Sequence, residues 1–546
     1  MRHSFRWALA ALCAIMLAEG GYAVHLNREF YRLHIPILDS CAYANNLAEV
    51  FTYAHTHGLA ASLRAGAIGG TVALPWVEAL VLAPVLEPSR ELCVWLQWIW
   101  LLALALSLYW YFTRYRNVPP WRAVCLTLPF AWFESALHWA GGLPDFRMDL
   151  SLYIFLALAS VWFLMARESG SRGAWLLTGV AGSMACLARA TAPVYLAVML
   201  GPLLTAEFVR APKSMAKRLP LMAIPYAAAL WFLVGNYAML HFYYAEWSPD
   251  ANRHLPLWQA LSHGVFGLAH LGIPLLAASL AAFVSAARKR KRIEPLAIDW
   301  RLAWLAASPA LFLILRGAGL NPYVSMPCVF GVLMFAFFPW RDARGEEAVS
   351  RPVCALAVAA CLLTAATAEL PHPLRGVSST HAAAMHSLID RIVDDARARG
   401  LRDVYYGIPE IGDFHSCAFI NTLIYDYRGR VESGGVLLPS GASLVFPDEA
   451  VFGASDVFLW NRVVPGKTDA LKMDYLVGAA LARQRYLLLP DERGLEFLER
   501  KRSYDFCNLK VRELKRRLLA TGRYALLGEP AEISAQEWIQ VYVRHD

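Results

Sequence analysis

The chain of 546 residues is 58% hydrophobic and 17% charged, and its mean hydropathy is +0.39. A soluble domain carries about 25% charged residues, so this composition excludes an ordinary soluble globular protein. The net charge is +8, and the Lys and Arg residues cluster in short segments between apolar blocks, as at the cytoplasmic ends of membrane spans. We therefore expect membrane lipid as a partner and no nucleic acid, with an RNA or phosphoinositide site at residues 288–292 as the alternative.

The apolar residues fall in blocks of about 17–25 residues, the length that a helix needs to cross a bilayer. These blocks extend from Arg6 to Leu370, after which the composition becomes that of a soluble domain. The sequence therefore predicts an α-helical polytopic membrane protein with about 11 transmembrane helices and a C-terminal extracytoplasmic α/β domain. The predicted boundary separates a transmembrane domain at 1–370 from a soluble domain at 371–546.

The charge pattern also predicts the orientation of the chain. A basic N-terminus precedes the first span, from Trp7 to about Val24, so we expect an uncleaved span with a cytoplasmic N-terminus. The first outside loop covers 26–90, and its apolar stretch at 71–86, which carries Pro75 and Pro84, is expected to lie along the interface. Further spans are expected at 92–112, 121–138, 150–166, 175–188, 193–209, 219–242, 264–287, 302–315, 324–340 and 352–370. Every basic cluster is then cytoplasmic, and the C-terminal domain is periplasmic.

Ionisable side chains gather on the predicted outer face. Charged groups near membrane depth are costly, so they tend to be paired or functional. The outer segments contain Asp39, Asp145, Arg147, Asp149, Arg189 and Arg316, together with His34, Tyr43, His55 and His57. A carboxylate among them could take a proton from an acceptor hydroxyl, and the arginines could hold a lipid-linked phosphate.

Each of these residues also has a purely structural interpretation. Asp39 could cap a helix that starts near Ser40, and Arg147 and Asp149 could form an ion pair at a helix start. The other two arginines could reach lipid headgroups, and the histidines could face solvent. The ordered arrangement on one face, rather than any single residue, favours a site.

Several motifs follow one another in an order typical of one enzyme family. The first loop holds Leu38-Asp39-Ser40, an apolar interfacial stretch follows, and the next span ends in basic residues at Arg114. Arg147-Met148-Asp149 then opens a span, and Leu187-Ala188-Arg189-Ala190-Thr191 lies between two others. Over about the first two hundred residues, and in architecture beyond them, the chain resembles GT-C-type glycosyltransferases. The similar bacterial group contains the lipid A aminoarabinose transferases and the protein O-mannosyltransferases. Two departures are Ser40, where many relatives have Glu, and Met148, where Pro is usual.

The resemblance implies a glycosyltransferase of the bacterial inner (plasma) membrane. Such an enzyme moves a sugar from a polyprenyl-phosphate donor to a hydroxyl on a lipid, glycan or protein acceptor at the outer face, with inversion. It would make Asp39 the general base, give Asp149 or Asp145 the role of second carboxylate, and use Arg147, Arg189 and Arg316 to neutralise the lipid phosphate. Acceptor or loop contacts are then expected at His34, Tyr43, His55 and His57. No cofactor is certain; some members use a divalent cation, for which Asp39 and Asp149 are the candidate ligands.

Two other functions fit a polytopic protein with these charges. A transporter or flippase for lipid-linked saccharides would carry charged groups through mid-membrane depth, and a ligase would need a large late loop with catalytic His and Arg. The loop at 243–263 is modest, although it holds Arg253 and His254. The gathering of charges at one rim favours a transferase.

The C-terminal domain alternates between helical and strand patterns. Helices are predicted at 380–399, 419–427, 495–500 and 511–519, and strands at 404–406, 456–460, 486–489 and 539–543. This alternation is typical of a small α/β sandwich, which would either cover the active-site cleft, receive the acceptor or act as a structural cap. If the domain is extracytoplasmic, Cys417 and Cys507 could form a disulfide.

Overall fold

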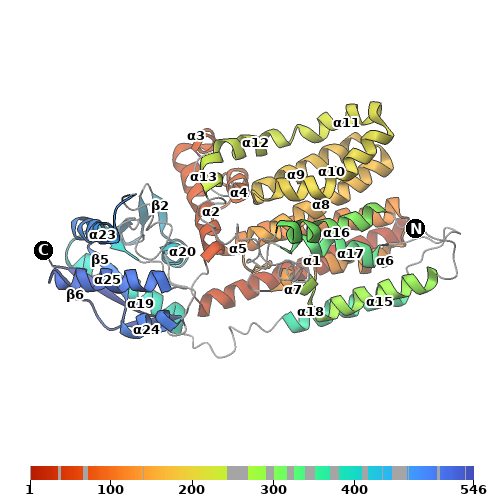
Figure 1. Cartoon of the computed structure of the whole chain (residues 1–546). Coiled ribbons are helices and arrows are strands. Elements are labelled where there is room, and N and C mark those ends of the chain that lie inside the picture. The colour runs from red at the N-terminus through yellow and green to blue at the C-terminus, as the bar shows by residue number, and fades with distance from the viewer. Residues whose placement is uncertain are drawn as a thin grey trace. The chain divides into compact units, whose positions relative to one another are not determined.

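The structure is a computed structural model. It describes residues 2–545 apart from 35–37, 66–71, 139–140, 243–267, 291–299, 317–324, 339–350, 369–379, 409–415, 433, 446–463, 465, 501–504 and 535–536. Two compact units share the chain (Figure 1). The helical unit contains Met1–Asn27, Leu63–Glu78 and Glu91–Pro371, and the sheet unit contains Arg28–Ser62, Ala79–Arg90 and His372–Asp546.

Several helices of the described chain are long and apolar enough to cross a membrane, so the protein is an integral membrane protein. Four qualify singly: α1 (Arg2–Leu33), α5 (Arg90–Trp110, continued as a π-helix to Tyr115), α8 (Met148–Ser169) and α10 (Ala192–Arg210). A fifth span results if α11 (Pro212–Ala223) and α12 (Tyr226–Gly235), bent by 54°, are taken together. The larger number of spans expected from the sequence stays a prediction.

The described part of the helical unit contains further helices. They are α4 (Leu74–Leu82), α6 (Pro120–Thr127), α7 (Glu134–Leu137), α9 (Arg172–Ala188), α13 (Tyr237–Phe242), α15 (Gly272–Arg290), α16 (Trp300–Arg316), α17 (Pro327–Phe337) and α18 (Arg351–Ala368). The continuous span expected at 121–138 is wrong, because α6 gives way to a 3-10 turn at Leu128–Phe130 before α7 begins. Pro129 explains the break, since it offers no N–H with which to continue the helix.

The directions of four helices are fixed by hydrogen bonds at their two ends. Trp98 of α5 donates to the carbonyl of Met16 at 2.6 Å, and Tyr109 donates to that of Phe5 at 3.1 Å, so α1 and α5 are antiparallel. Gln97 of α5 donates to the carbonyl of Arg147, just before α8, and Tyr111 donates to Glu168 near its end. The helices α5 and α8 are therefore parallel, and the C-terminal end of α9 lies at their common N-terminal end.

The core of the helical unit is built around α8. Side chains are buried all around this helix, the pattern of a helix enclosed by others. Gly170, with φ +66°, ends α8 and allows the chain to reverse into α9. Gly182 of α9 faces the ring of Tyr226 so closely that a Cβ there would lie 1.8 Å from the phenol oxygen, which is the close approach that small residues allow between membrane helices.

The sheet unit contains a mixed β-sheet with the strand order β2-β3-β4-β1-β5-β8-β6, in which β7 also pairs with β8. The strands are β1 (Asp403–Gly407), β2 (Arg430–Glu432), β3 (Gly435–Leu437), β4 (Ser443–Val445), β5 (Tyr486–Pro490), β6 (Tyr524–Leu526), β7 (Ala531–Ser534) and β8 (Glu537–Arg544). The central strand β1 is parallel to β4 and β5, with Val404 opposite Leu444 and Tyr406 opposite Tyr486. The other pairs are antiparallel.

Helices cover both faces of this sheet. Alternate residues of β5 show why: Tyr486 and Leu488 join one core with α19 (Thr380–Ala398) and α20 (Ser416–Tyr425). Leu487 and Leu489 join another with α23 (Asp469–Arg483) and α25 (Asp505–Ala520). The described chain also contains α24 (Glu492–Arg500), which follows β5. The predicted sheet-containing C-terminal domain is confirmed, whereas α23 was not expected and the strand expected at 456–460 lies outside the described residues.

Part of the first predicted loop belongs to the sheet unit. The helix α2 (Leu38–His57), which α3 (Leu59–Ala65) follows, packs against α20. Asn45 of α2 donates to the carbonyl of Cys417 at 2.9 Å, Asn421 donates to Asn45 Oδ1 at 2.9 Å, and Tyr425 donates to the carbonyl of Ala44 at 2.7 Å. These hydrogen bonds, together with the buried side chain of Ala48, fix the position of α2 on the C-terminal domain.

Candidate functional site

Arg147, Asp149 and Arg189, here called the trio, form a buried ionic group in the helical unit. Arg147 is the extended residue before α8 (φ −95°), and Arg189 is the extended residue after α9 (φ −151°). Arg189 Nη2 lies 2.6 Å from Asp149 Oδ2, and Arg147 Nε lies 3.8 Å from the same oxygen. The Asp149 side chain is 2% exposed and each guanidinium-bearing side chain 14%. The first turn of α8 adds a helix dipole that favours the carboxylate.

Contacts from three other segments hold the backbone beside the trio. Gln97 Nε2 of α5 donates to the carbonyl of Arg147 at 2.7 Å, and Asn27 Nδ2 of α1 donates to the carbonyl of Pro144 at 2.8 Å. Just before α4, the N–H of Ala73 donates to the carbonyl of Leu187 at 2.8 Å. The two guanidinium groups therefore extend from non-helical residues, and hydrogen bonds to neighbouring helices of the bundle fix the backbone beside them.

The chemistry of the trio suits an anion. Two guanidinium groups face one carboxylate, which leaves one net positive charge in a low-dielectric setting. A guanidinium presents paired N–H donors that match the oxygens of a phosphate group. The same setting strengthens any charge interaction that forms there.

Asp145, the other carboxylate before α8, has a different environment. It is 6% exposed, and its Oδ2 accepts a hydrogen bond from the N–H of Gly141 at 2.5 Å. This contact closes the turn that leads into α8, so Asp145 shapes the loop, whereas Asp149 makes the ion pair with Arg189.

The other predicted site residues do not join the trio within the described contacts. Asp39 is the second residue of α2 and Arg316 is the last residue of α16, but their side chains lie outside the described residues. Within the sheet unit, His34 stacks on Phe30 with 4.8 Å between ring centroids, and Tyr43 is buried. Exposed His55 and His57 contact the carbonyl of Ala83 at 2.5 Å and the ring of Tyr53 at 4.3 Å, respectively.

Metal ligands and a disulfide were also expected as possibilities. In the described part of the chain, no three His, Cys, Asp or Glu side chains gather as they would around a metal ion. The side chain of Cys507 lies outside the described residues, so its pairing with Cys417 stays a prediction.

Two buried polar groups of the helical unit were not identified as a site from the sequence. His270 is 5% exposed, and its ring nitrogens lie 2.6 Å from Ser135 Oγ and 2.9 Å from Ser325 Oγ. Glu78 of α4 is 6% exposed and accepts a hydrogen bond from Trp100 at 2.7 Å. Neither contact follows a local spacing, because the partners come from distant parts of the chain.

The sheet unit has its own polar centre at Arg90, the first residue of α5. Arg90 Nη1 lies 2.5 Å from Asp426 Oδ1, its Nη2 donates to Asn421 Oδ1 at 3.0 Å, and its guanidinium lies 4.4 Å from the Tyr31 ring centroid. Burial alone would raise the pKa of Asp426, but the hydrogen bond with His386 and the charge and hydrogen bond of Arg90 hold it below its ordinary value. Within the sheet unit, these contacts join Arg90 and Tyr31 to each other and Arg90 to Asn421 of α20 and to Asp426 just after it.

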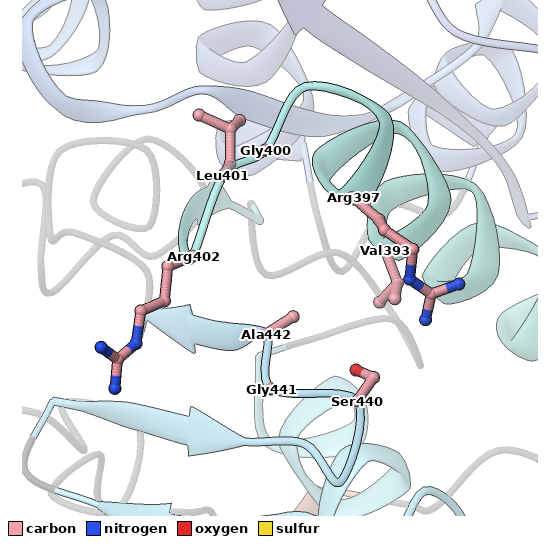
Figure 2. A pocket seen from close by; sticks show the side chains of 8 residues that line it. All are labelled: Val393, Arg397, Gly400, Leu401, Arg402, Ser440, Gly441 and Ala442. Atoms are coloured by element: carbon pink, nitrogen blue, oxygen red, sulfur yellow. The ribbon is translucent and has the colours of Figure 1, made fainter.

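The sheet unit also has a hollow of about 270 Å³ at the end of α19 (Figure 2). Its lining comes from Val393, Arg397, Gly400, Leu401, Arg402, Ser440, Gly441 and Ala442. The guanidinium groups of Arg397 and Arg402 point to opposite sides of the hollow (Figure 2), and Arg397 pairs with Asp394 at 3.4 Å. The charged groups of the hollow therefore do not face one another, unlike those of the trio.

Comparison with known proteins identifies the fold. No protein-family model and no curated protein sequence matches the chain. ArnT from Cupriavidus metallidurans, solved with undecaprenyl phosphate bound, is similar over 98% of this chain and 97% of its own, with 12% identity and a TM-score of 0.56. An Archaeoglobus fulgidus oligosaccharyltransferase (10% identity, 87% and 69% covered, TM-score 0.48) and the mycobacterial arabinofuranosyltransferase AftD (13%, 98% and 40%, 0.45) are more distant. The predicted GT-C-type fold is confirmed.

Proposed function

We propose that the chain is a membrane glycosyltransferase that moves a sugar from a polyprenyl-phosphate donor to an acceptor hydroxyl. The observation that carries the proposal is the trio, a buried pair of guanidinium groups at the ends of α8 and α9. The fold supports it, because the similar ArnT structure contains undecaprenyl phosphate. A phosphate on a lipid chain would place its charge at the trio and its isoprenoid tail against apolar helices.

In the proposed reaction, the acceptor oxygen forms a bond to the anomeric carbon while the bond from that carbon to the phosphate oxygen breaks. The acceptor proton goes to a carboxylate, and the polyprenyl phosphate leaves with the electron pair. Arg147 and Arg189 stabilise the charge that grows on this leaving group, and Arg316 shares the role by resemblance. Because a phosphate leaving group is stable as an anion, the step needs no general acid.

The general base in this proposal is Asp39, which the resemblance to GT-C enzymes assigns. Attack from the face opposite the phosphate gives inversion at the anomeric carbon. The acceptor is a lipid, glycan or protein at the outer face of a bacterial inner membrane, with the N-terminus cytoplasmic and the C-terminal domain periplasmic. Asp149 then serves as the second carboxylate by fixing the Arg189 guanidinium.

The proposed function is tested by incubating the purified full-length protein with a panel of labelled polyprenyl-phosphate sugars and candidate acceptors. We expect release of polyprenyl phosphate together with a labelled acceptor, and a rate at least about 100-fold lower for Asp39→Asn. Glu49→Gln, an exposed substitution on the same helix α2, is the matched control and should keep the rate.

Two results would overturn the proposal at different levels. Absence of donor cleavage with every sugar, or movement of an intact donor across the membrane, would exclude a transferase. Donor cleavage that persists in Asp39→Asn would retain the transferase and remove Asp39 as its base.

A further inference from the structure

Glu78 is a buried carboxyl group of the helical unit to which the proposed reaction gives no role. It lies on the short apolar helix α4 and is 6% exposed. Its Oε1 accepts a hydrogen bond from Trp100 Nε1 at 2.7 Å. Its Oε2 is buried and has no hydrogen-bond partner among the described residues. A buried polar atom left in this state costs free energy unless a ligand satisfies it.

Contacts along α5 and α8 place Glu78 near the trio. Trp100 packs on Phe155 of α8 with 5.0 Å between ring centroids. Gln97, about one helical turn earlier on α5, donates to the carbonyl of Arg147. Phe155 follows Arg147 by eight residues, which is about 12 Å of helix rise. The two contacts therefore bracket Glu78 at about 5 to 12 Å further along the bundle than the backbone of Arg147.

A second contact fixes the start of α4 beside the trio. The N–H of Ala73 donates to the carbonyl of Leu187 at 2.8 Å, two residues before Arg189. Glu78 follows Ala73 by five residues, so α4 leads from the Arg189 end of the trio to Trp100. The two sets of contacts agree on the position of the carboxyl group.

The surroundings of Glu78 favour its neutral form. Trp100 of α5 is the polar group that faces the carboxyl, and among the described residues no charged side chain pairs with it. A carboxyl buried without a counter-charge resists ionisation. The neutral form carries an O–H donor, whereas a carboxylate could only accept hydrogen bonds and would repel an anion.

We propose that Glu78 is a further binding residue for the lipid donor, whose neutral carboxyl donates a hydrogen bond from Oε2 to a phosphate oxygen held by Arg147 and Arg189. The inference rests on the proposed function and adds a residue to its phosphate site. It assigns the ligand class as a phosphate attached to an isoprenoid chain, because Trp100 and Phe155 supply an apolar wall beside the carboxyl.

The test measures the binding of undecaprenyl phosphate to the purified full-length protein between about pH 7 and pH 9, above the range in which the lipid phosphate takes up its second proton. We expect wild-type affinity to fall as the pH rises, because ionisation of Glu78 removes the donor and adds repulsion. Glu78→Ala should bind about tenfold more weakly at the low end of this range. Glu78→Gln keeps an N–H donor at every pH, so its affinity should stay near the wild-type value at low pH and lose the pH dependence.

Glu168→Gln is the matched control, because Glu168 is an acid of the same unit paired with Tyr111 and Arg116. It should bind like the wild type at every pH. If Glu78→Ala does not fold, the pH profile of Glu78→Gln decides the matter. Wild-type affinity and pH dependence in the two Glu78 variants would overturn the inference alone. Failure of the wild-type protein to bind undecaprenyl phosphate would instead overturn the proposed function.

Discussion

The two ends of α8 carry the same kind of ionic group in different settings. At the N-terminal end, Arg147 and Arg189 face Asp149. At the C-terminal end, Arg167 Nε lies 2.8 Å from Glu207 Oε1, and Arg301 Nη2 lies 3.1 Å from the same oxygen. Each group has two guanidiniums, one carboxylate and little exposure. Charge count and burial alone therefore do not separate a binding site from a structural cross-link.

The two ionic groups differ in the secondary structure that carries their arginines. Arg167 and Glu207 lie inside the last turns of α8 and α10, and Arg301 lies near the start of α16, so their ion pairs tie three helices together. In the trio, Arg147 and Arg189 instead lie outside helices, the first just before α8 and the second just after α9. The start of α8 leaves N–H donors that favour anions. Further along the bundle from the trio is Glu78, whose buried Oε2 has no hydrogen-bond partner among the described residues. The comparison supports the proposed ligand site at the N-terminal end of α8 and a structural role for the ion pairs at its C-terminal end.

The largest expected difference between the two ends of α8 is in the rate of sugar transfer. Arg189→Gln should lower the initial rate of sugar transfer by about 100- to 1,000-fold, because a donor that stabilises developing charge is removed. Arg301→Gln, the same chemical change at the other end of α8, should leave the rate near the wild-type value. The measurement is release of labelled polyprenyl phosphate by the two purified variants. Equal rates in both would contradict the assignment of the site.

A somewhat smaller effect concerns stability. Asp149→Asn leaves two guanidinium groups facing each other without their buried counter-charge, so we expect a loss of about 3 kcal/mol in the free energy of unfolding. Glu207→Gln should also destabilise the protein, but less, because the side chain of Glu207 is 12% exposed whereas that of Asp149 is 2% exposed. Denaturant unfolding in micelles, followed by tryptophan fluorescence, measures both. A stable Asp149→Asn variant would show that the trio is not an ion pair in the folded protein.

The smallest expected effect is on the free energy of unfolding, at the Arg90–Asp426 ion pair of the sheet unit, which serves as a reference for the two groups on α8. Asp426→Asn should cost about 2 kcal/mol at neutral pH, because the charge-assisted bonds with Arg90 and His386 are weakened. The folded-state pKa of Asp426 is lowered, so this stability is present above the unfolded-state value of about 3.9 and is lost as the pH falls through the folded-state value.

The measurement is the unfolding free energy of wild type and Asp426→Asn from neutral pH down to about pH 3. We expect the difference between the two curves to shrink as the pH falls below about 4. A difference that stays constant over this range would mean that the ionisation of Asp426 does not contribute to the stability of the sheet unit.

Local sequence signals predicted much of the fold and part of the site. Apolar blocks predicted α8, α9 and α10 within a few residues, because long uninterrupted apolar helices follow from hydrophobicity alone. Arg147 and Asp149 were recognisable because they flank the start of such a block, and Arg189 because it interrupts two of them. Their ion pair with one another, by contrast, is a property of the antiparallel packing of α8 and α9.

The rest depended on contacts that no local spacing encodes. Glu78 and Trp100 are 22 residues apart, and Ser135 and His270 are 135 apart, so neither pair follows helical or strand periodicity. The break after α6 was missed because the apolar pattern at 121–138 outweighed Pro129 in the interpretation. The packing of α2 against α20 depends on a hydrogen bond between the amides of Asn45 and Asn421. From sequence alone, an asparagine is expected at the surface, so this contact was not predicted.

The most direct test of the account is the affinity of undecaprenyl phosphate for the wild-type protein, Arg189→Gln and Arg301→Gln, measured side by side at one pH. We predict that the wild type and Arg301→Gln bind this lipid with similar affinity and that Arg189→Gln binds it much more weakly. Equal affinity in Arg189→Gln and Arg301→Gln would contradict the placement of the lipid phosphate at the N-terminal end of α8.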